Sequence, residues 1–487
     1  MAVMSLPESP AATRVGGGDL ADLPAVEMLA AYRSRQLSPV EVIDAVRARI
    51  EAAEPTLCAL WASSADTWRD DALASERRWR DGRPAGALDG VPITLKDNIA
   101  TRGTATPLGT AGTELVPAAE DAPPAARVRE AGAVLLGKTT MPDFGMLSSG
   151  LSSFHRLARN PWNPAWTPGG SSAGAGAAAA AGYGPLHVGT DIGGSLRLPA
   201  SWTGIVTLKP SNGTVPIDPP YHGRVAGPMT RTVADTALLM RVLAQPDWRD
   251  HRSLPARALD WTALDGAEDM VRRLRIGLLT DAGCGLPTDP EVADAVRAAA
   301  RLFESAGAVV EAVEPFFSRE MLDDLDLFWR ARGWVDLSSM PRDRQAAVLP
   351  YIAEWCRGGA DVPGAVLMRC VNRMLEISRS TVAATQPFDY VLSPVSPVPA
   401  FAAELPSPTN DVNRPMEHIT FTVPYNMSEQ PASSINCGWT GDGRPIGLQI
   451  AGRRFDDLGV LRVTRWYEAA RPRDAVPAWD RMRERFA

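Results

Sequence analysis

The sequence lacks the features that mark several large classes of protein. Its five cysteines are scattered and odd in number, with no Cys-x-x-Cys pair, so neither a disulfide framework nor a zinc site is expected. Basic residues are not in excess: 50 lysines and arginines face 57 aspartates and glutamates, which argues against a general nucleic-acid binder. No uncharged run is apolar enough to cross a bilayer. We therefore expect a cytoplasmic protein with no metal or organic cofactor and with neither a nucleic-acid nor a membrane partner.

Histidine is also scarce, which limits the choice of catalytic base. Only five histidines occur among 487 residues, and none lies in a glycine-rich turn. His187 sits in an apolar stretch and is expected to be structural. A Ser-His-Asp triad therefore has weak support, and a serine nucleophile in this chain would need another base.

What the chain does contain is a regular alternation of short apolar runs and amphipathic segments. With 45% hydrophobic and 22% charged residues, it is typical of a protein with a substantial core. The alternation predicts a single large α/β/α domain with a mixed, mostly parallel central sheet and peripheral helical insertions. Residues 1–20 are expected to form a loose leader, residues 21–487 the domain, and residues 315–390 a helical insertion.

Local patterns predict individual elements. Ser38 is an expected helix N-cap, followed by Pro39 in the first turn. The alanine-rich stretch 173–181 predicts a helix whose amino end faces Ser171 and Ser172. Further helices are expected over 66–82, 125–131, 289–306 and most of 320–385, and strands over 91–95, 133–136, 206–208, 275–279 and 308–313.

Two serine-centred segments carry most of the chemical information. Pro168–Ser172 and Gly189–Arg197 lie in one block rich in glycine and alanine, and 24 positions separate Ser171 from Ser195. Lys96, at the end of the predicted strand 91–95, could serve as their base, because a dry interior would favour its neutral amine. Taken alone, an ion pair between Lys96 and its neighbour Asp97 on a surface turn is the simpler explanation.

The run Gly193-Gly194-Ser195 suits an oxyanion hole, because small residues let backbone N–H groups converge on a developing negative charge. A phosphate-binding loop or an ordinary tight turn would use the same residue types. The spacing matches neither G-x-x-x-x-G-K-[ST] nor G-x-G-x-x-G, so nucleotide binding is the weaker functional alternative.

Taken together, these segments resemble the amidase signature family from about residue 23 to the C-terminus, with core motifs at 88–235 and 423–452. The similarity rests on motifs that occur in order along the chain: Gly90-Val91-Pro92 with Lys96-Asp97-Asn98, Gly137-Lys138-Thr139, Pro168-Gly169-Gly170-Ser171-Ser172, Gly189 to Ala200, Leu208-Lys209-Pro210, Gly227 to Asp235, Val423-Pro424-Tyr425-Asn426 and Gly443 to Gln449.

The resemblance implies a Ser–cisSer–Lys triad. Ser195 would be the nucleophile, Ser171 the bridging serine after a cis peptide bond, and Lys96 the base. The resemblance also implies an oxyanion hole formed by the backbone N–H groups of Ile192, Gly193, Gly194 and Ser195. It implies supporting roles for Ser172, Asp191 and Arg197. The expected substrate contacts are Met146, Gly170 and Thr190.

The expected function is hydrolysis of C–N bonds in uncharged, partly apolar amides, aryl amides and carbamates among them, by a monomer or a homodimer. No acidic or basic cluster in the sequence indicates a charged substrate. One alternative is the glutamine-hydrolysing subunit of a tRNA-dependent amidotransferase, but Leu198 stands where the resemblance to such subunits would require glutamine. Another is a binding scaffold without activity, against which the complete set of Lys96, Ser171 and Ser195 argues.

Overall fold

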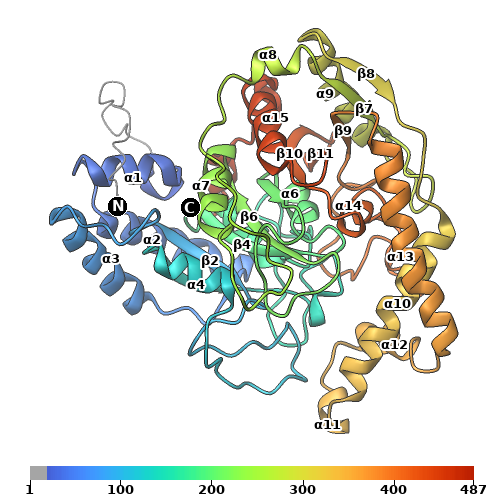
Figure 1. Ribbon diagram of the computed structural model, residues 1–487. Helices are drawn as coiled ribbons and strands as arrows, with labels where there is room; N and C mark the ends of the chain where they lie inside the picture. Colours follow the sequence, from blue (N-terminus) through green and yellow to red (C-terminus); the bar gives the residue numbers. More distant parts are fainter. Residues whose placement is uncertain (1–18, 487) are drawn as a thin grey trace.

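A sheet of eleven strands runs through the centre of the computed structural model, which describes residues 19–486 (Figure 1). The strand order is β1-β3-β2-β4-β6-β5-β10-β11-β9-β7-β8. The expected leader at 1–20 lies outside the described residues except for its last two positions. The strands are β1 (Leu60–Trp61), β2 (Pro92–Lys96), β3 (Val134–Thr139), β4 (Leu186–Asp191), β5 (Val206–Lys209), β6 (Val225–Thr230), β7 (Arg275–Leu278), β8 (Val309–Ala312), β9 (Tyr390–Pro394), β10 (Ala432–Trp439) and β11 (Pro445–Gly452).

The single α/β domain and the mixed sheet agree with the prediction, but the sheet is not mostly parallel. Among residues 19–486, six of the ten strand pairings are antiparallel. The connections account for part of this pattern. β5 leads to β6, and β10 to β11, without an intervening helix, and such neighbours pair antiparallel. Of the four parallel pairs, β2–β3 and β7–β8 are each joined through one helix.

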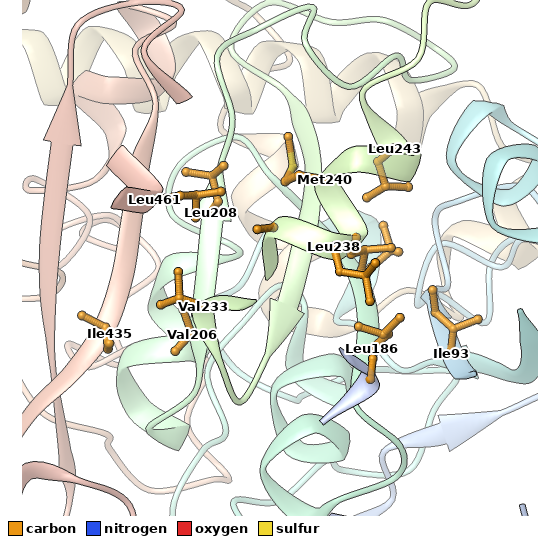
Figure 2. Close-up of a cluster of buried hydrophobic side chains, with 14 of the residues drawn as sticks. Ile93, Leu186, Val206, Leu208, Val233, Leu238, Met240, Leu243, Ile435 and Leu461 are labelled. Carbon is orange, nitrogen blue, oxygen red and sulfur yellow. The ribbon is translucent and has the colours of Figure 1, made fainter. Parts of the chain in front are cut away.

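Helices cover both faces of the sheet. On one face α7 and α15 pack over the strands, and their side chains form the main core with leucines, isoleucines and valines of the sheet (Figure 2). On the other face lie α5 and α6, which cluster with Val225 and Met229 of β6, whereas Ala226 belongs to the main core. The helices are η1 (Leu20–Asp22), α1 (Ala25–Arg33), α2 (Pro39–Leu57), α3 (Ala65–Arg80), α4 (Pro123–Glu130), η2 (Asp143–Gly145), α5 (Ala173–Ala181), α6 (Arg197–Thr203), α7 (Val233–Leu243), α8 (Ala267–Val271), α9 (Pro290–Ser305), α10 (Arg319–Ser338), α11 (Arg342–Gln345), α12 (Pro350–Arg357), α13 (Gly364–Thr385), α14 (Val423–Met427), α15 (Asp457–Ala470), η3 (Arg473–Ala475) and α16 (Trp479–Arg483).

A second apolar cluster lies to one side of the sheet, where α10, α12 and α13 pack together (Figure 1). Apart from Arg319, the first residue of α10, these helices fall within the predicted helical stretch 320–385. Trp329 and Trp355 are buried in this cluster together with Leu198, which comes from the serine-containing part of the chain. No helix within the described residues is both long enough and apolar enough to cross a membrane.

The alanine-rich helix α5 spans the predicted residues and positions the serine turn that precedes it. All nine of its residues are small and buried. At Gly174 an added Cβ would lie only 2.2 Å from the carbonyl oxygen of Ala59 and 2.4 Å from the backbone nitrogen of Thr140. Only glycine allows so close an approach. The helix is thereby held against β3, and its amino end lies at the edge where β2 and β4 end.

Candidate active site

Lys96 ends β2 in the interior of the protein. Its side chain is fully buried, and its Nζ lies 2.8 Å from Oγ of Ser171 and 3.0 Å from Oγ1 of Thr190. Asp97 is engaged elsewhere, since its Oδ2 lies 2.9 Å from Nε2 of the buried His155. The surface ion pair between Lys96 and Asp97, the simpler explanation from sequence alone, is therefore wrong.

The surroundings of Lys96 favour its neutral form. Burial, followed by the positive charge of Arg224, lowers the pKa of Lys96 to about 7, although Asp191 and Asp97 act in the opposite direction. A large share of the amine is then unprotonated near neutral pH. Such an amine can accept a proton from a hydroxyl within hydrogen-bond distance, and Ser171 provides one.

The turn before α5 presents Ser171 to this amine. The peptide bond between Gly170 and Ser171 is cis, as the family resemblance implies. The next residue, Ser172, donates its hydroxyl to the carbonyl oxygen of Thr190 at 3.1 Å and accepts the N–H of Thr190 at 3.3 Å. These two bonds fasten the turn to β4, so that Ser171 and Thr190 both reach Nζ of Lys96.

A buried ion pair shapes the next turn, between β4 and α6. Nε and Nη2 of Arg197 each donate to the Asp191 carboxylate at 3.0 Å. The same carboxylate accepts the backbone N–H of Gly194 at 2.7 Å and of Leu196 at 3.1 Å. Burial opposes the charge on Asp191, but the Arg197 guanidinium outweighs it and holds the pKa of Asp191 well below its usual range. The pair therefore fixes the backbone on both sides of Ser195.

The bond between Gly194 and Asp191 corrects one part of the expected oxyanion hole. A backbone N–H that already faces a carboxylate is not free to stabilise a developing negative charge. The backbone N–H groups of Ile192, Gly193 and Ser195 have no hydrogen-bond acceptor within residues 19–486. Three of the four expected donors thus remain available.

Ser195 lines two cavities. The smaller has an empty volume of about 420 Å³ and largely apolar walls, which include Met146, Ile192, Leu198, Trp329, Met416 and Ile419. The wider has an empty volume of about 1750 Å³ and is also lined by Ser171 and Thr190. The two serines thus share a cavity, although no hydrogen bond joins their hydroxyls in the described part of the chain. The two cavities therefore meet at Ser195.

Of the three residues expected to contact substrate, two line the cavities and one does not. Met146 lines both cavities and Thr190 lines the wider one. Gly170 lines neither of them. It packs against the backbone of the loop that follows Met146, where an added Cβ would lie 2.5 Å from the nitrogen of Ser149 and 2.6 Å from the carbonyl oxygen of Leu147. Gly170 therefore has a packing role, because no side chain fits at this position.

Several residues of the site have no assigned role in the sequence analysis. The sequence around Trp329 of α10 does not show whether this tryptophan lines a cavity or packs in the core. Three others lie in or beside the closing motifs and bind the ion-paired turn: Thr422 donates its hydroxyl to the carbonyl oxygen of Gly193 (2.6 Å), and the side-chain oxygens of Asn426 and Gln449 accept from Arg197 (2.6 and 2.8 Å). Asn426 and Gln449 lie within the quoted motifs and Thr422 directly precedes one, but the sequence does not indicate which residues they contact.

The chain is similar to known proteins over most of its length. The family model described as Amidase matches residues 41–461. The chain is 36% identical to a glutamyl-tRNA(Gln) amidotransferase subunit of Myxococcus xanthus, with 92% of this chain and 97% of the relative covered. It is 32% identical to an acylamidase of Rhodococcus erythropolis, with 94% and 97% covered. Among solved structures, a bacterial aryl acylamidase superimposes with a TM-score of 0.85 at 29% identity, covering 96% of this chain and 98% of the other. A 6-aminohexanoate cyclic dimer hydrolase superimposes with a TM-score of 0.83 at 27% identity, with 95% and 99% covered.

Proposed function

This chain belongs to the amidase signature family of hydrolases, and from that premise we propose that it cleaves amide C–N bonds through an acyl-enzyme on Ser195. The proposed substrates are uncharged and partly apolar around the scissile bond, with aryl amides and carbamates among them. The observation that carries the proposal is the buried Lys96, whose lowered pKa and 2.8 Å contact with Ser171 place a proton acceptor beside the cavity that Ser195 lines.

The proposed reaction begins with two proton transfers. Neutral Lys96 accepts the hydroxyl proton of Ser171 while Ser171 takes that of Ser195, and Ser195 Oγ attacks the substrate carbonyl carbon. The missing hydrogen bond between the serines is expected to form once substrate is bound, since such bonds often tighten only in the complex. The oxyanion that results is stabilised by the free N–H groups of Ile192, Gly193 and Ser195.

The tetrahedral species then breaks its C–N bond. The proton held by the lysine and the bridging serine passes to the leaving nitrogen, so the amine departs as a neutral molecule and the acyl group stays on Ser195. A water molecule gives its proton to the same relay and attacks the acyl carbon. Release of the carboxylic acid restores the hydroxyl of Ser195 and neutral Lys96.

The smaller cavity supports the proposed substrate class. Leu198, Trp329 and Ile419 give it apolar walls, and transfer of an apolar group from water into such a space is favourable. Leu198 occupies the position at which a glutamine would have indicated the glutamine-hydrolysing members. An acyl or aryl group is therefore the expected occupant.

Hydrolysis of a matched panel tests the proposal. Acetamide, acetanilide, an aryl carbamate, an aryl ester and free glutamine would each be incubated with the protein, and products measured by mass spectrometry. The Ser195→Ala variant serves as the blank. We expect turnover of the anilide or the carbamate that disappears in the variant. Turnover that persists in Ser195→Ala would contradict the assignment of the nucleophile.

One specific observation favours a second candidate, the glutamine-hydrolysing subunit of a tRNA-dependent amidotransferase. The 36% identity to the Myxococcus xanthus protein exceeds the 32% identity to the acylamidase. Glutamine in the same panel separates the two functions. Release of ammonia from glutamine alone, together with recovery of partner subunits when the protein is purified from its natural host, would favour the amidotransferase.

A further inference from the structure

Two arginines line the wider cavity and form no ion pair with a carboxylate in the part of the chain that the structure describes. Arg224 lies in the loop between β5 and β6, and Arg332 lies on α10. Within residues 19–486, the only hydrogen bond from the Arg224 side chain goes to the carbonyl oxygen of Pro219, at 3.1 Å. The Arg332 guanidinium carbon stands 4.0 Å from the centre of the Tyr221 ring. No carboxylate in the described chain lies within 4.0 Å of either guanidinium, so most of their donors are free.

The two guanidinium groups lie close enough to repel each other. The pKa of Arg224 falls to about 10, through burial first and then through the charge of Arg332. Arg224 nevertheless remains charged at neutral pH. Two acidic residues, Asp218 and Asp336, also line the cavity and attract Arg224 and Arg332 respectively, but burial raises the pKa of Asp336. Asp218 and Asp336 do not remove the repulsion between the two arginines. An anion bound between the two guanidinium groups would reduce it.

The position of Arg332 relates this charge to the reacting serine. Arg332 lines both cavities that meet at Ser195, whereas Arg224 lines only the wider one and is close enough to lower the pKa of Lys96. A substrate with its apolar group in the smaller cavity would extend its other substituent past Arg332 into the wider cavity. The arginines would then meet that second substituent, away from the apolar end.

We propose that Arg224 and Arg332 bind a carboxylate on this second substituent, so that the preferred amides are apolar at one end and acidic at the other. The proposal rests on the proposed hydrolytic function and deepens it by naming the substrate class. Arginine suits the task because its planar guanidinium offers paired N–H donors that match the two oxygens of a carboxylate. The stacking of Arg332 on Tyr221 holds one of these groups in place before the substrate arrives.

A third arginine provides a matched control. Arg344 lines the same cavity, but its Nη1 lies 3.1 Å from Oε2 of Glu114, with which it forms an ion pair. Replacing Arg344 removes the same charge from the same cavity without removing a free guanidinium. A difference between Arg344 and the two unpaired arginines therefore separates specific recognition from the general charge of the cavity.

Binding to the Ser195→Ala protein tests the proposal without turnover. The probes are 3- and 4-acetamidobenzoate, each compared with the nitroacetanilide in which a neutral nitro group of the same shape replaces the carboxylate. Binding is measured by calorimetry. We expect at least one carboxylate to bind about tenfold or more tightly than its nitro counterpart. Adding Arg332→Gln or Arg224→Gln should abolish this preference and change nitro binding less than about twofold, whereas Arg344→Gln should preserve the preference.

The outcomes that overturn the proposal are distinct. Equal binding of carboxylate and nitro probes, no measurable carboxylate binding, or an equal loss in Arg344→Gln would each refute recognition by Arg224 and Arg332. Arg332→Lys covers the case in which the glutamine variant fails to fold. It keeps the charge and loses the planar fork, so it should retain part of the preference. Hydrolysis of the nitroacetanilides by the unmodified protein is measured separately, so a failure of the hydrolytic function is seen independently of the binding result.

Discussion

Thr422 donates its hydroxyl hydrogen to the carbonyl oxygen of Gly193 across 2.6 Å. The nitrogen of the same peptide unit belongs to Gly194 and donates to Asp191 across 2.7 Å. Both polar atoms of the peptide between the two glycines are thus fixed by residues far apart in the sequence. A planar peptide held at both ends cannot rotate, and this one adjoins the two peptide units that carry the N–H groups of Gly193 and Ser195, so it restricts where those groups can lie.

We predict from this arrangement that Thr422→Val lowers kcat about tenfold or more, with little change in KM. Valine preserves the shape of threonine but loses the bond to Gly193, so the oxyanion donors would drift from their place, where each is worth roughly 10²–10³ in rate. The measurement is steady-state kinetics on the anilide. Thr381→Val on α13 is the matched control, because it too removes a buried hydroxyl that donates to a backbone carbonyl oxygen, here that of Ile377 at 2.7 Å. Equal kinetic loss in both variants would indicate general destabilisation.

We expect Lys96→Arg to be as inactive as Lys96→Ala, with kcat reduced by at least about 10³. Arginine retains a positive charge at the position but does not lose a proton at neutral pH, so it cannot act as the base. Single-turnover assays with the anilide provide the measurement, and circular dichroism checks that both variants fold. A folded Lys96→Arg protein with substantial activity would show that the positive charge, and not the neutral amine, serves the reaction.

The pKa of Lys96 predicts the pH dependence of the reaction. The active form is the neutral amine, so kcat/KM should be low in acid and rise with pH through about 7. Arg224 lowers this pKa, and Arg224→Gln should therefore shift the rise to higher pH. Profiles between pH 5 and 9 on a neutral anilide give the measurement, with Arg344→Gln as the control. A flat wild-type profile, or a shift to lower pH in Arg224→Gln, would contradict the role of Lys96.

Replacement of Arg197 by methionine should destabilise the fold by about 3–5 kcal/mol, because the fully buried Asp191 would lose its charged partner. Urea unfolding followed by tryptophan fluorescence measures the change. The exposed pair of Arg297 with Asp294 on α9 offers a comparison. Arg297→Met should cost no more than about 1 kcal/mol. Similar losses in the two variants would mean that the Arg197 pair contributes no more than a surface contact.

Much of the fold could be predicted from local patterns. The helix 173–181 begins and ends where its alanines do, and the predicted N-cap Ser38, with Pro39 in the first turn, marks the start of α2. The direction of strand pairing was harder to predict. A helix between two strands does not by itself set that direction, because β4 and β6 pair antiparallel although α6 lies between them in the sequence. The strand β6 itself carries a weak signal, because its sequence, Val225–Thr230, contains a glycine and a proline. The strand β4 was missed because its last residues belong to the glycine-rich segment.

Some residues of the candidate site could also be predicted from the sequence, and others could not. Lys96, Ser171 and Ser195 could be named because they lie in long ordered motifs. Their neighbours Trp329, Arg224 and Arg332 could not, because nothing near them in the sequence distinguishes a cavity wall or an unpaired charge from a core or surface residue. Clusters of charged side chains that form only in the folded protein are the hardest to predict, and no acidic or basic cluster is visible in the sequence. Arg224 and Arg332 are more than 100 positions apart, and only the packing of α10 beside the loop after β5 brings them to one cavity.

The main core under α7 and α15 and the second cluster around α10, α12 and α13 have different consequences for the site. The strand β2, which ends at Lys96, and the strand β4, which precedes the Ser195 turn, contribute to the main core, whereas Trp329, Met416 and Ile419 belong to the second cluster beside the sheet. Substitutions in that second cluster can therefore reshape the pocket while the reacting groups keep their places. A library restricted to α10 and residues 416–419 is the natural starting point for directing this enzyme toward new amides.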